Sequence, residues 1–402
     1  MCSKSRWLPP VRREHAWCEL AVAHGHPVTF IEAPSDIRKL RSMGTRRWMA
    51  GVVAPESRVG DETVCVRRRS TVTPGHVNRV ASAIDARLLG RVLRTTTSEF
   101  VGGALVCCWP WDWPATQKAP VRRRIFDMAD DWGELMPGRR DRFADLYARI
   151  AAEADEIIVV NPSLVQRFPG RGPLVIRNGV SEIMLTASST TPDARTLLYV
   201  GTLTPRFDSS LMKAVMSRLT DWRLELVGAC MYPGLGEAPA GELRELLSLG
   251  PRVTWHGPVA RTDLVDALDR ATVAIIPNRP ERSLGQDSMK LYDYAARGRP
   301  IVSTRWSESL GEEGPPGLRL ASSADEFVAA ILDAAQEPVE WAAQRRGWAH
   351  ANTWRRRWAQ WSAAVFGTPP TDVADGIKAA APDRTGRRAQ ALSPSAPASW
   401  QA

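Results

Sequence analysis

The sequence predicts an α/β protein with two doubly wound, Rossmann-like domains. Short apolar strands alternate with helices of about ten residues, and glycine turns follow several of the strands. The chain of 402 residues is also longer than one ordinary core requires. Such alternation gives a parallel sheet covered by helices on both faces.

The alternation is most regular between 196 and 304. The expected strands are "TLLYVGTL", "RLELVGA", "RVTWHGPV" and "TVAIIPN", and the expected helices are "FDSSLMKAVMSRL", "GELRELLSL" and "RTDLVDALDRA". The segment "QDSMKLYDYAARGRPIVST" at 286–304 adds a helix, a glycine stop and a strand. We therefore predict a second domain over 196–340.

The first half shows the same elements less regularly. The segment "REHAWCELAVAHG" has a helical period, and "PVTFIEA", "GALVCCW", "RRRIFDMADD", "EIIVVNP" and "LVIRNGV" are typical of strands, with a helix expected around 140–154. We therefore predict a first domain over 1–180 and a polar linker over 181–195. A doubly wound domain normally opens with a strand, yet only "MCS" precedes "KSRWLPP". Either the first strand is very short, or the true start of the chain lies upstream of Met1.

The chain beyond 340 changes character. We predict one tryptophan-rich helix over 341–366, in which Trp348, Ala351, Trp354 and Trp358 share a face that docks on a core. Residues 367–402 are rich in Pro, Ala and Ser, and we predict a disordered tail.

The net charge of +9 favours anionic partners such as phosphorylated ligands. The arginines are dispersed and no nucleic-acid-binding motif is present, so we expect no nucleic-acid partner. Only six of the 53 basic residues are lysines, which makes a lysine in a proposed site informative. The sequence has no apolar run of the roughly 18 residues that span a bilayer and no signal peptide, so we expect a cytoplasmic protein. The cysteines lack CxxC spacing and predict neither a disulfide framework nor a zinc site.

Candidate site residues follow strands of the second domain, where open parallel sheets bind ligands. In "VGTLTPRFD", Gly201 would let the backbone approach a phosphate, and Arg206 would clamp it with two hydrogen bonds. An ordinary strand-to-helix turn is the alternative. For His256, which ends a strand, we favour a structural role over a catalytic one.

The segment 286–304 allows two interpretations. If a helix starts near Asp287, then Asp287, Lys290 and Asp293 share one face, and the opposite face consists of Leu291, Tyr294 and Ala295. The polar face is either a solvated helix surface capped by Asp287, or a nucleotide site in which Lys290 meets a diphosphate and Asp293 meets ribose hydroxyls. Its expected position at the same sheet edge as Gly201 and Arg206 favours the nucleotide site.

The sequence lacks the motifs of several enzyme classes. No GxGxxG follows a strand, which weakens a dehydrogenase interpretation, and no GK[ST] phosphate loop is present. The GxSxG and HExxH patterns are also absent.

The motifs resemble glycosyltransferases of the GT-B fold. Within that fold they are similar to the retaining family 4, and within the family to its bacterial polysaccharide or teichuronic-acid-type branch. The resemblance implies that the two Rossmann-like domains face each other across a cleft. The matching segments are "LLYVGTL", "VTWHGPV", "REHAWCELAVAHGHPVTFIEAP", "FDMADDW" and "DSMKLYDYAARGRPIVST", the last being similar to the family's "KLYEYLAxGKPVVST". The resemblance implies transfer of a hexosyl unit, with retention, from a nucleotide diphosphate sugar to a hydroxyl of a polysaccharide, glycolipid or natural product. The segment "ANTWRRR" resembles the part of the family's chain that crosses back to the first domain.

The resemblance also implies residue roles. Arg206 and Lys290 would bind the donor diphosphate, and Asp293 would bind the ribose as the second carboxylate of the family's E-x7-E motif. The first glutamate of that motif is replaced by Gly285, so Asp287 is the candidate contact for the donor sugar.

In the first domain, the resemblance places His15, Asp130 and Asp131 near the acceptor, as candidate catalytic residues. They would serve as bases if the reaction inverts the anomeric carbon. We expect no cofactor and no metal, because cations and helix N-termini would stabilise the leaving diphosphate.

Two other functions stay open. A sugar-nucleotide epimerase would share the fold, and Gly285 is also compatible with a non-catalytic nucleotide-sugar-binding or scaffold protein. The basic charge is compatible with peripheral contact with the inner face of a membrane. The sequence does not indicate an oligomeric state.

Overall fold

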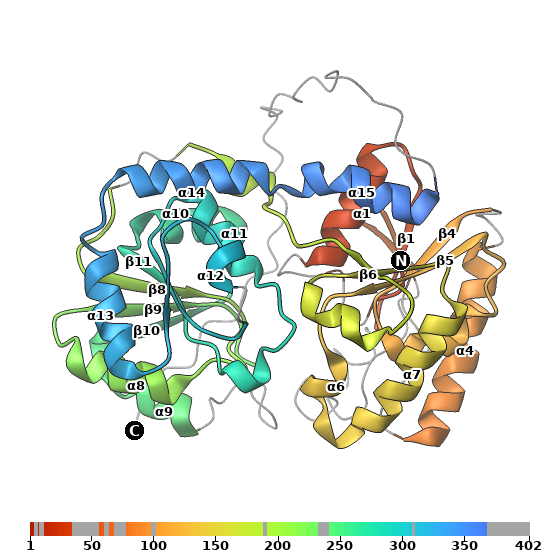
Figure 1. The fold of residues 1–402 in the computed structure, drawn as a ribbon, viewed down its shortest axis with the longest axis horizontal. Helices are drawn as coiled ribbons and strands as arrows, with labels where there is room; N and C mark the ends of the chain where they lie inside the picture. The colour runs from red at the N-terminus through yellow and green to blue at the C-terminus, as the bar shows by residue number, and fades with distance from the viewer. Residues whose placement is uncertain are drawn as a thin grey trace. The chain divides into compact units, whose positions relative to one another are not determined.

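The computed structural model describes residues 1–3, 7, 12–33, 56–59, 64–67, 78–97, 102–187, 191–231, 241–307 and 310–367. It contains two lobes, each with mostly parallel strands and with helices on both faces, and the one antiparallel pairing among the described strands joins 56–59 to 64–67 in the first lobe (Figure 1). This confirms the predicted α/β fold of two Rossmann-like domains. We call 1–180 together with the last helix the first lobe, and 196–351 the second lobe. The predicted tail lies, after Gly367, outside the described residues.

The second lobe has a six-stranded parallel sheet in the order β10-β9-β8-β11-β12-β13. Its strands are β8 Thr196–Val200, β9 Arg223–Val227, β10 Val253–Gly257, β11 Val273–Ile276, β12 Ile301–Thr304 and β13 Leu318–Ala321. Its helices are α8 Ser209–Arg218, α9 Gly241–Leu247, α10 Arg261–Arg270, α11 Met289–Ala296, α12 Leu310–Glu313, α13 Ala324–Ala334 and α14 Glu340–Ala351. Each strand and helix predicted between 196 and 304 is present.

Alternating strand residues build the two cores of this lobe. In β8, Leu197 and Tyr199 pack with α8, α9 and α13, whereas Leu198 packs with α10, α11 and α14. Asp208 accepts a hydrogen bond from the Leu211 N–H at 2.9 Å and so caps α8 directly after the β8 turn. The carboxyl ends of β8 and β11 therefore meet the starts of helices at one edge of the sheet.

The first lobe has the strand orders β1-β3-β2 and β4-β5-β6-β7. Its strands are β1 Val28–Ile31, β2 Glu56–Val59, β3 Val64–Arg67, β4 Ala104–Cys107, β5 Arg123–Met128, β6 Glu156–Val159 and β7 Leu174–Val175. Its helices include α1 Arg13–Ala23, α4 Arg79–Thr97, α5 Trp113–Thr116, α6 Trp132–Leu135 and α7 Arg140–Glu153. Cys2 forms parallel bridges to both Ile31 and Cys107, and so joins the two groups of strands where the sequence predicted a short first strand.

The prediction of one C-terminal helix over 341–366 is wrong. Two helices, α14 and α15 (Trp354–Phe366), are separated at Thr353, whose hydroxyl accepts a hydrogen bond from the Arg356 N–H at 3.2 Å and caps α15. Helix α15 packs beside α1 in the first lobe, with Trp17 and Trp361 stacked at 5.0 Å between ring centres (Figure 1). The tryptophans predicted to share one face lie on two helices because the chain crosses between the lobes at this break.

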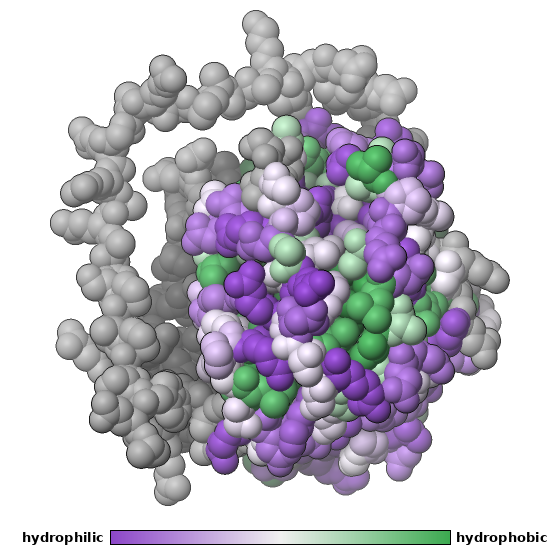
Figure 2. Space-filling view, turned by 90° about the vertical axis from the view of Figure 1, so that its left-hand side faces the viewer, coloured by the Kyte–Doolittle hydropathy of each residue, from purple (hydrophilic) through white to green (hydrophobic). Residues whose placement is uncertain are grey.

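The surface of the second lobe is mostly polar. Figure 2 shows the side of the molecule that is on the left in Figure 1, where hydrophobic residues form separate patches among polar ones. Exposed large hydrophobic residues of the described chain include Leu332 in α13 and Val339 before α14. Within the described residues, the helices are too short or too polar to cross a membrane.

Candidate active site

The turn after β8 brings Lys290 against the backbone. Gly201 has a φ of +148°, and a Cβ added to it would lie 2.5 Å from Lys290 Cε. Its N–H donates to the carbonyl oxygen of Val227 at 2.8 Å, so this amide is already used in the sheet. Gly201 therefore provides room for the Lys290 side chain, which the sequence alone did not predict.

Lys290 of α11 is a half-buried cation that lies beside the carboxyl end of β8. Its ammonium nitrogen lies 5.2 Å from the centre of the Tyr199 ring. Burial and, to a smaller extent, the nearby Arg206 lower the pKa of Lys290 to about 8, against the opposing effect of Asp293. Within the described chain the ammonium forms no ion pair or hydrogen bond to another side chain. Lys290 thus has no ion-pair partner among the described residues, and beside Arg206 it is suited to bind a diphosphate.

Arg206 connects the two lobes. Its guanidinium donates a hydrogen bond to Asp130 Oδ1 at 3.0 Å, and about a quarter of the Arg206 side chain (25%) is exposed. The Arg279 N–H donates to the Arg206 carbonyl oxygen at 2.7 Å and fixes the turn against the segment after β11. The structure thus brings a residue predicted to bind the donor into contact with one predicted on the acceptor side.

Asp293 lies one helical turn after Lys290 and is also half-buried. Burial raises the pKa of its carboxyl group to about 7, although Arg261 and Lys290 act in the opposite direction. In the described part of the molecule, this carboxylate accepts no hydrogen bond. The Lys290 and Asp293 face is therefore partly withdrawn from solvent and has no hydrogen-bond partners among the described side chains, which favours the nucleotide site over the solvated helix surface.

Asp287 does not start the helix, contrary to the expectation. Helix α11 begins at Met289, and Asp287 is turned toward the first lobe. Its carboxylate accepts a hydrogen bond from the Asn178 N–H at 2.6 Å and lies 2.9 Å from the Tyr292 hydroxyl. Burial raises the pKa of Asp287, while the Asn178 N–H lowers it. Asp287 thus joins the lobes, and both carboxylate oxygens have protein partners.

Gly285 stands where the resembling family has its first glutamate, and the structure gives a steric reason for glycine there. Its φ is +71°, and an added Cβ would lie 2.6 Å from Leu164 Cδ2 and 3.5 Å from Asp131 Cβ. Any larger residue would meet both backbone strain and the first lobe.

The other first-lobe candidates have local partners. The His15 ring is buried, its Nδ1 accepts a hydrogen bond from the Arg12 N–H at 3.2 Å, and Trp7 and Phe30 pack around it. A further candidate, the Asp131 carboxylate, caps α6 and lies 2.7 Å from the Arg167 guanidinium. Of the three acceptor-side candidates, Asp130 is the one for which a contact with the donor-side candidates is seen among the described residues.

Sequence reasoning missed Tyr199, Arg261 and Asn178, which act on the candidate residues from other elements. Tyr199 precedes the turn glycine by two residues, and this spacing is the signal in the sequence that indicates its position at the turn. The His256 ring contacts the Glu225 carboxylate of the neighbouring strand, in keeping with a structural role.

Residues 194–337 match the family model described as glycosyl transferases group 1. No curated protein sequence matches the chain. Among solved structures, sucrose-phosphate synthase from Thermosynechococcus elongatus aligns with a TM-score of 0.67 and 15% identity, over 87% of this chain and 90% of that one. HepE from Anabaena in complex with UDP-glucose aligns with a TM-score of 0.65 and 14% identity, over 91% and 98%.

WaaG, a glycosyltransferase involved in lipopolysaccharide biosynthesis, aligns with a TM-score of 0.61 and 13% identity, over 91% of this chain and 99% of that one. At these identities the structures show the shared GT-B fold. The family match shows that 194–337 form a glycosyltransferase group 1 domain, and the chain is a glycosyltransferase.

Proposed function

We propose that this enzyme transfers a hexosyl unit, with retention, from a nucleotide diphosphate sugar to an acceptor hydroxyl. The observation that carries the proposal is the position of Lys290, a half-buried ammonium that lies against Gly201 at the carboxyl end of β8 beside a second cation, Arg206. A diphosphate would give Lys290 the ion-pair partner that it lacks among the described residues. Asp293, one turn further along α11, would accept hydrogen bonds from the ribose hydroxyls.

The proposed reaction exchanges one bond at the anomeric carbon for another. The bond from this carbon to the diphosphate oxygen breaks, and the acceptor oxygen forms a new bond to the same face. The leaving nucleoside diphosphate takes the acceptor proton, so a retaining reaction requires no protein base. Lys290 and Arg206 would stabilise the charge that develops on the departing oxygen.

The contact between Arg206 and Asp130 suggests how donor binding prepares the acceptor side. A diphosphate competes with the Asp130 carboxylate for the Arg206 guanidinium. Once released, Asp130 is available to accept a hydrogen bond from the acceptor hydroxyl. His15 and Asp131, which have local partners, would then support the shape of this region.

We also propose that no metal or other cofactor takes part, because side-chain cations provide the charge next to the diphosphate. Turnover should be unchanged after treatment with EDTA. A loss of activity that Mg²⁺ or Mn²⁺ restores would contradict this part of the proposal.

A panel of UDP-, GDP- and dTDP-sugars, incubated with the enzyme and cell-derived acceptors, tests the function. Uridine donors come first because HepE was solved with UDP-glucose. We expect nucleoside diphosphate release together with a hexosyl-bearing acceptor by mass spectrometry, and an unchanged anomeric configuration by NMR. An altered sugar still attached to its nucleotide would favour the epimerase, and binding without turnover would favour the non-catalytic alternative.

A further inference from the structure

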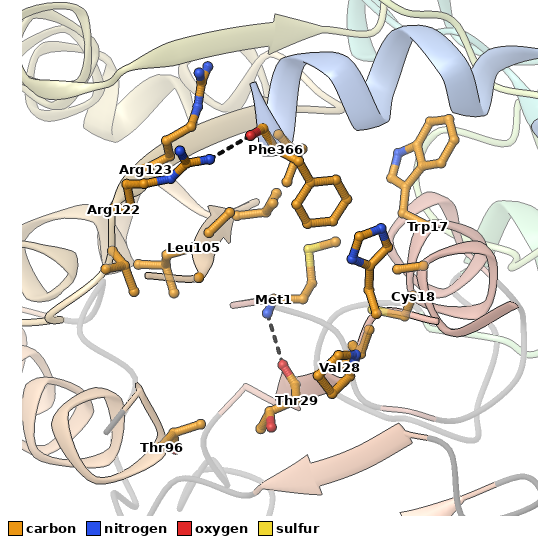
Figure 3. Close-up of a pocket in the computed structure, with 18 of the residues that line it drawn as sticks. Met1, Trp17, Cys18, Val28, Thr29, Thr96, Leu105, Arg122, Arg123 and Phe366 are labelled. Atoms are coloured by element: carbon orange, nitrogen blue, oxygen red, sulfur yellow. Dashed lines mark hydrogen bonds between the residues drawn. The ribbon is translucent and has the colours of Figure 1, made fainter. Parts of the chain in front are cut away.

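Helix α4 (Arg79–Thr97) lies at the outer edge of the first lobe, on the side away from the second lobe (Figure 1). Its inward face is fixed by packing, because Leu89 and Leu93 belong to the core of this lobe. Leu93 and Thr96 also line a cavity of about 490 Å³ beside β1 and β4 (Figure 3). The opposite face of α4 therefore points away from the lobe.

The outward face of α4 carries one row of exposed side chains. The row follows spacings of four, three, four and three residues and consists of Val80, Ile84, Arg87, Arg91 and Arg94. This spacing aligns side chains along one side of an α-helix. Val80 is 69% exposed and Ile84 is 49% exposed, so two large aliphatic side chains lie in water one turn apart. The row is thus apolar at its first end and cationic at its other end, and we call it the α4 row.

The three arginines of the α4 row have no ion-pair partner among the described residues. Arg149 of α7, which is also exposed, differs from them because it pairs with Glu153 at 2.8 Å. The single acid of α4, Asp85, is buried. The segment 110–116, which packs against α4, also has one acid, Asp112, and this residue is buried too. The cationic end of the row is therefore suited to an anionic partner.

An anionic bilayer surface matches both ends of the α4 row. Lipid phosphates would bind the guanidinium groups, and the boundary of the acyl chains would take up Val80 and Ile84. From Val80 to Arg94 the row is roughly 21 Å long, so an inclined helix reaches both layers while its arginine side chains extend back to the headgroups. The Asn78 side chain accepts a hydrogen bond from the Ala81 N–H at 2.8 Å and caps the end nearest the acyl chains. A dissolved polyanion would pair with the arginines but leave the two aliphatic side chains in water.

We propose that the α4 row binds the surface of an anionic lipid bilayer. The bilayer contacts the outer edge of the first lobe and leaves the side toward the second lobe open (Figure 1). Binding has two components, the charge pairing of the arginines and the burial of the aliphatic side chains, and each can be removed without the other. This inference does not depend on the proposed glycosyl transfer.

Flotation of the full chain with lipid vesicles tests the charged component. Vesicles of phosphatidylcholine are compared with vesicles in which about one third of the lipid is phosphatidylglycerol. We expect the protein to bind the anionic vesicles far more tightly, and this binding should weaken as the salt concentration rises to about 1 M. The combined change Arg87→Gln, Arg91→Gln and Arg94→Gln should weaken it roughly 100-fold, because each cation near an anionic surface contributes about fivefold.

The matched control for these changes is a second triple variant with the same net charge. It carries Arg223→Gln, Arg270→Gln and Arg356→Gln, which alter exposed arginines outside α4. We expect this control to bind anionic vesicles nearly as tightly as the unaltered chain. Equal losses in the two triple variants would overturn the proposal, and so would an unaltered chain that does not bind anionic vesicles.

The variant Val80→Ser with Ile84→Ser tests the apolar component. It keeps every charge of the row, and serine has a helix propensity close to that of valine and isoleucine. Its affinity for anionic vesicles should fall roughly tenfold, because the two side chains no longer bury apolar surface. Unchanged affinity would overturn the assignment of a bilayer and would indicate a site for dissolved polyanions instead. Thermal unfolding of each variant shows whether it is folded.

Discussion

The two ends of helix α11 carry opposite kinds of charged pair. At its C-terminal end, Arg297 and Asp269 are buried, with guanidinium-to-carboxylate distances of 2.6 and 2.7 Å, and Arg297 also donates to the carbonyl oxygens of Met184 and Thr186. Near its start, Lys290 and Asp293 are half-buried, and neither is hydrogen-bonded to another described side chain. Arg297 and Asp269 find their hydrogen-bond partners within the protein, whereas Lys290 and Asp293 can still form hydrogen bonds to a ligand.

Burial alone does not distinguish a structural ion pair from a binding site. Both pairs contain a cation and a carboxylate at least partly withdrawn from water. The difference is the number of hydrogen bonds that the protein supplies. Arg297 should therefore serve stability and Lys290 should serve ligand binding, and the two roles can be separated by mutation.

The largest expected effect is on stability, in Asp269→Ala. This change leaves the Arg297 guanidinium buried without its carboxylate and should lower the free energy of unfolding by about 3–5 kcal/mol. Denaturant unfolding measures it. A loss below about 1 kcal/mol would show that the Arg297 pair is not the structural element we describe.

Lys290→Ala should weaken donor binding and leave stability nearly unchanged. Donor affinity should fall by about 1.5–3 kcal/mol because a charged hydrogen bond to the diphosphate is lost, while the free energy of unfolding changes little. Lys213→Ala is the matched control, since Lys213 is an exposed lysine of the same lobe that pairs with Glu245 at 2.8 Å. Equal donor affinities of the two variants, measured by calorimetry, would return Lys290 to a structural role.

The pH dependence of donor binding tests both groups of the second pair. Below a pH of about 7 Asp293 becomes neutral, and above a pH of about 8 Lys290 loses its proton, so donor affinity should be greatest between these values. It should fall by up to roughly tenfold per pH unit on either side. Asp293→Asn should abolish the loss of donor affinity at low pH, and Lys290→Ala should abolish the loss of donor affinity at high pH. A donor affinity of the unaltered enzyme that does not change with pH would contradict these assignments.

Gly285→Glu restores the glutamate of the resembling family and should destabilise the protein by about 1–3 kcal/mol. The cost has two parts, the backbone conformation and the contact with Leu164. Gly172→Glu separates them, because Gly172 also has a positive φ of +58° but no atom within 4 Å of its added Cβ. Equal costs in thermal unfolding would mean that the contact with the first lobe contributes nothing.

The smallest expected effect is that of Asp130→Asn. The pair with Arg206 is partly exposed, so its loss should change stability by about 0–1 kcal/mol. Donor affinity should rise, by up to about fivefold, because Arg206 is no longer held by a carboxylate. A fall in donor affinity would show instead that Asp130 positions Arg206 for the donor.

The second lobe was predictable because its signals are local. Strand and helix patterns between 196 and 304 follow from neighbouring residues, and the helix face with Leu291 and Tyr294 is buried as expected. The break at Thr353 was not predictable, since it depends on the crossing between lobes. The Asn178 partner of Asp287 and the Leu164 neighbour of Gly285 lie in the first lobe, more than a hundred residues away in sequence, where helical spacing carries no information.

The most direct measurement is the pKa of the Lys290 ammonium with and without nucleotide, by NMR of isotope-labelled lysines. The chain has only six lysines, and Lys290→Ala assigns the signal. We predict a pKa of about 8 in the free enzyme and a clear rise when UDP, GDP or dTDP binds, because a diphosphate stabilises the charged form. A Lys290 pKa that none of the three nucleotides changes would contradict the central claim that this lysine is part of the donor site.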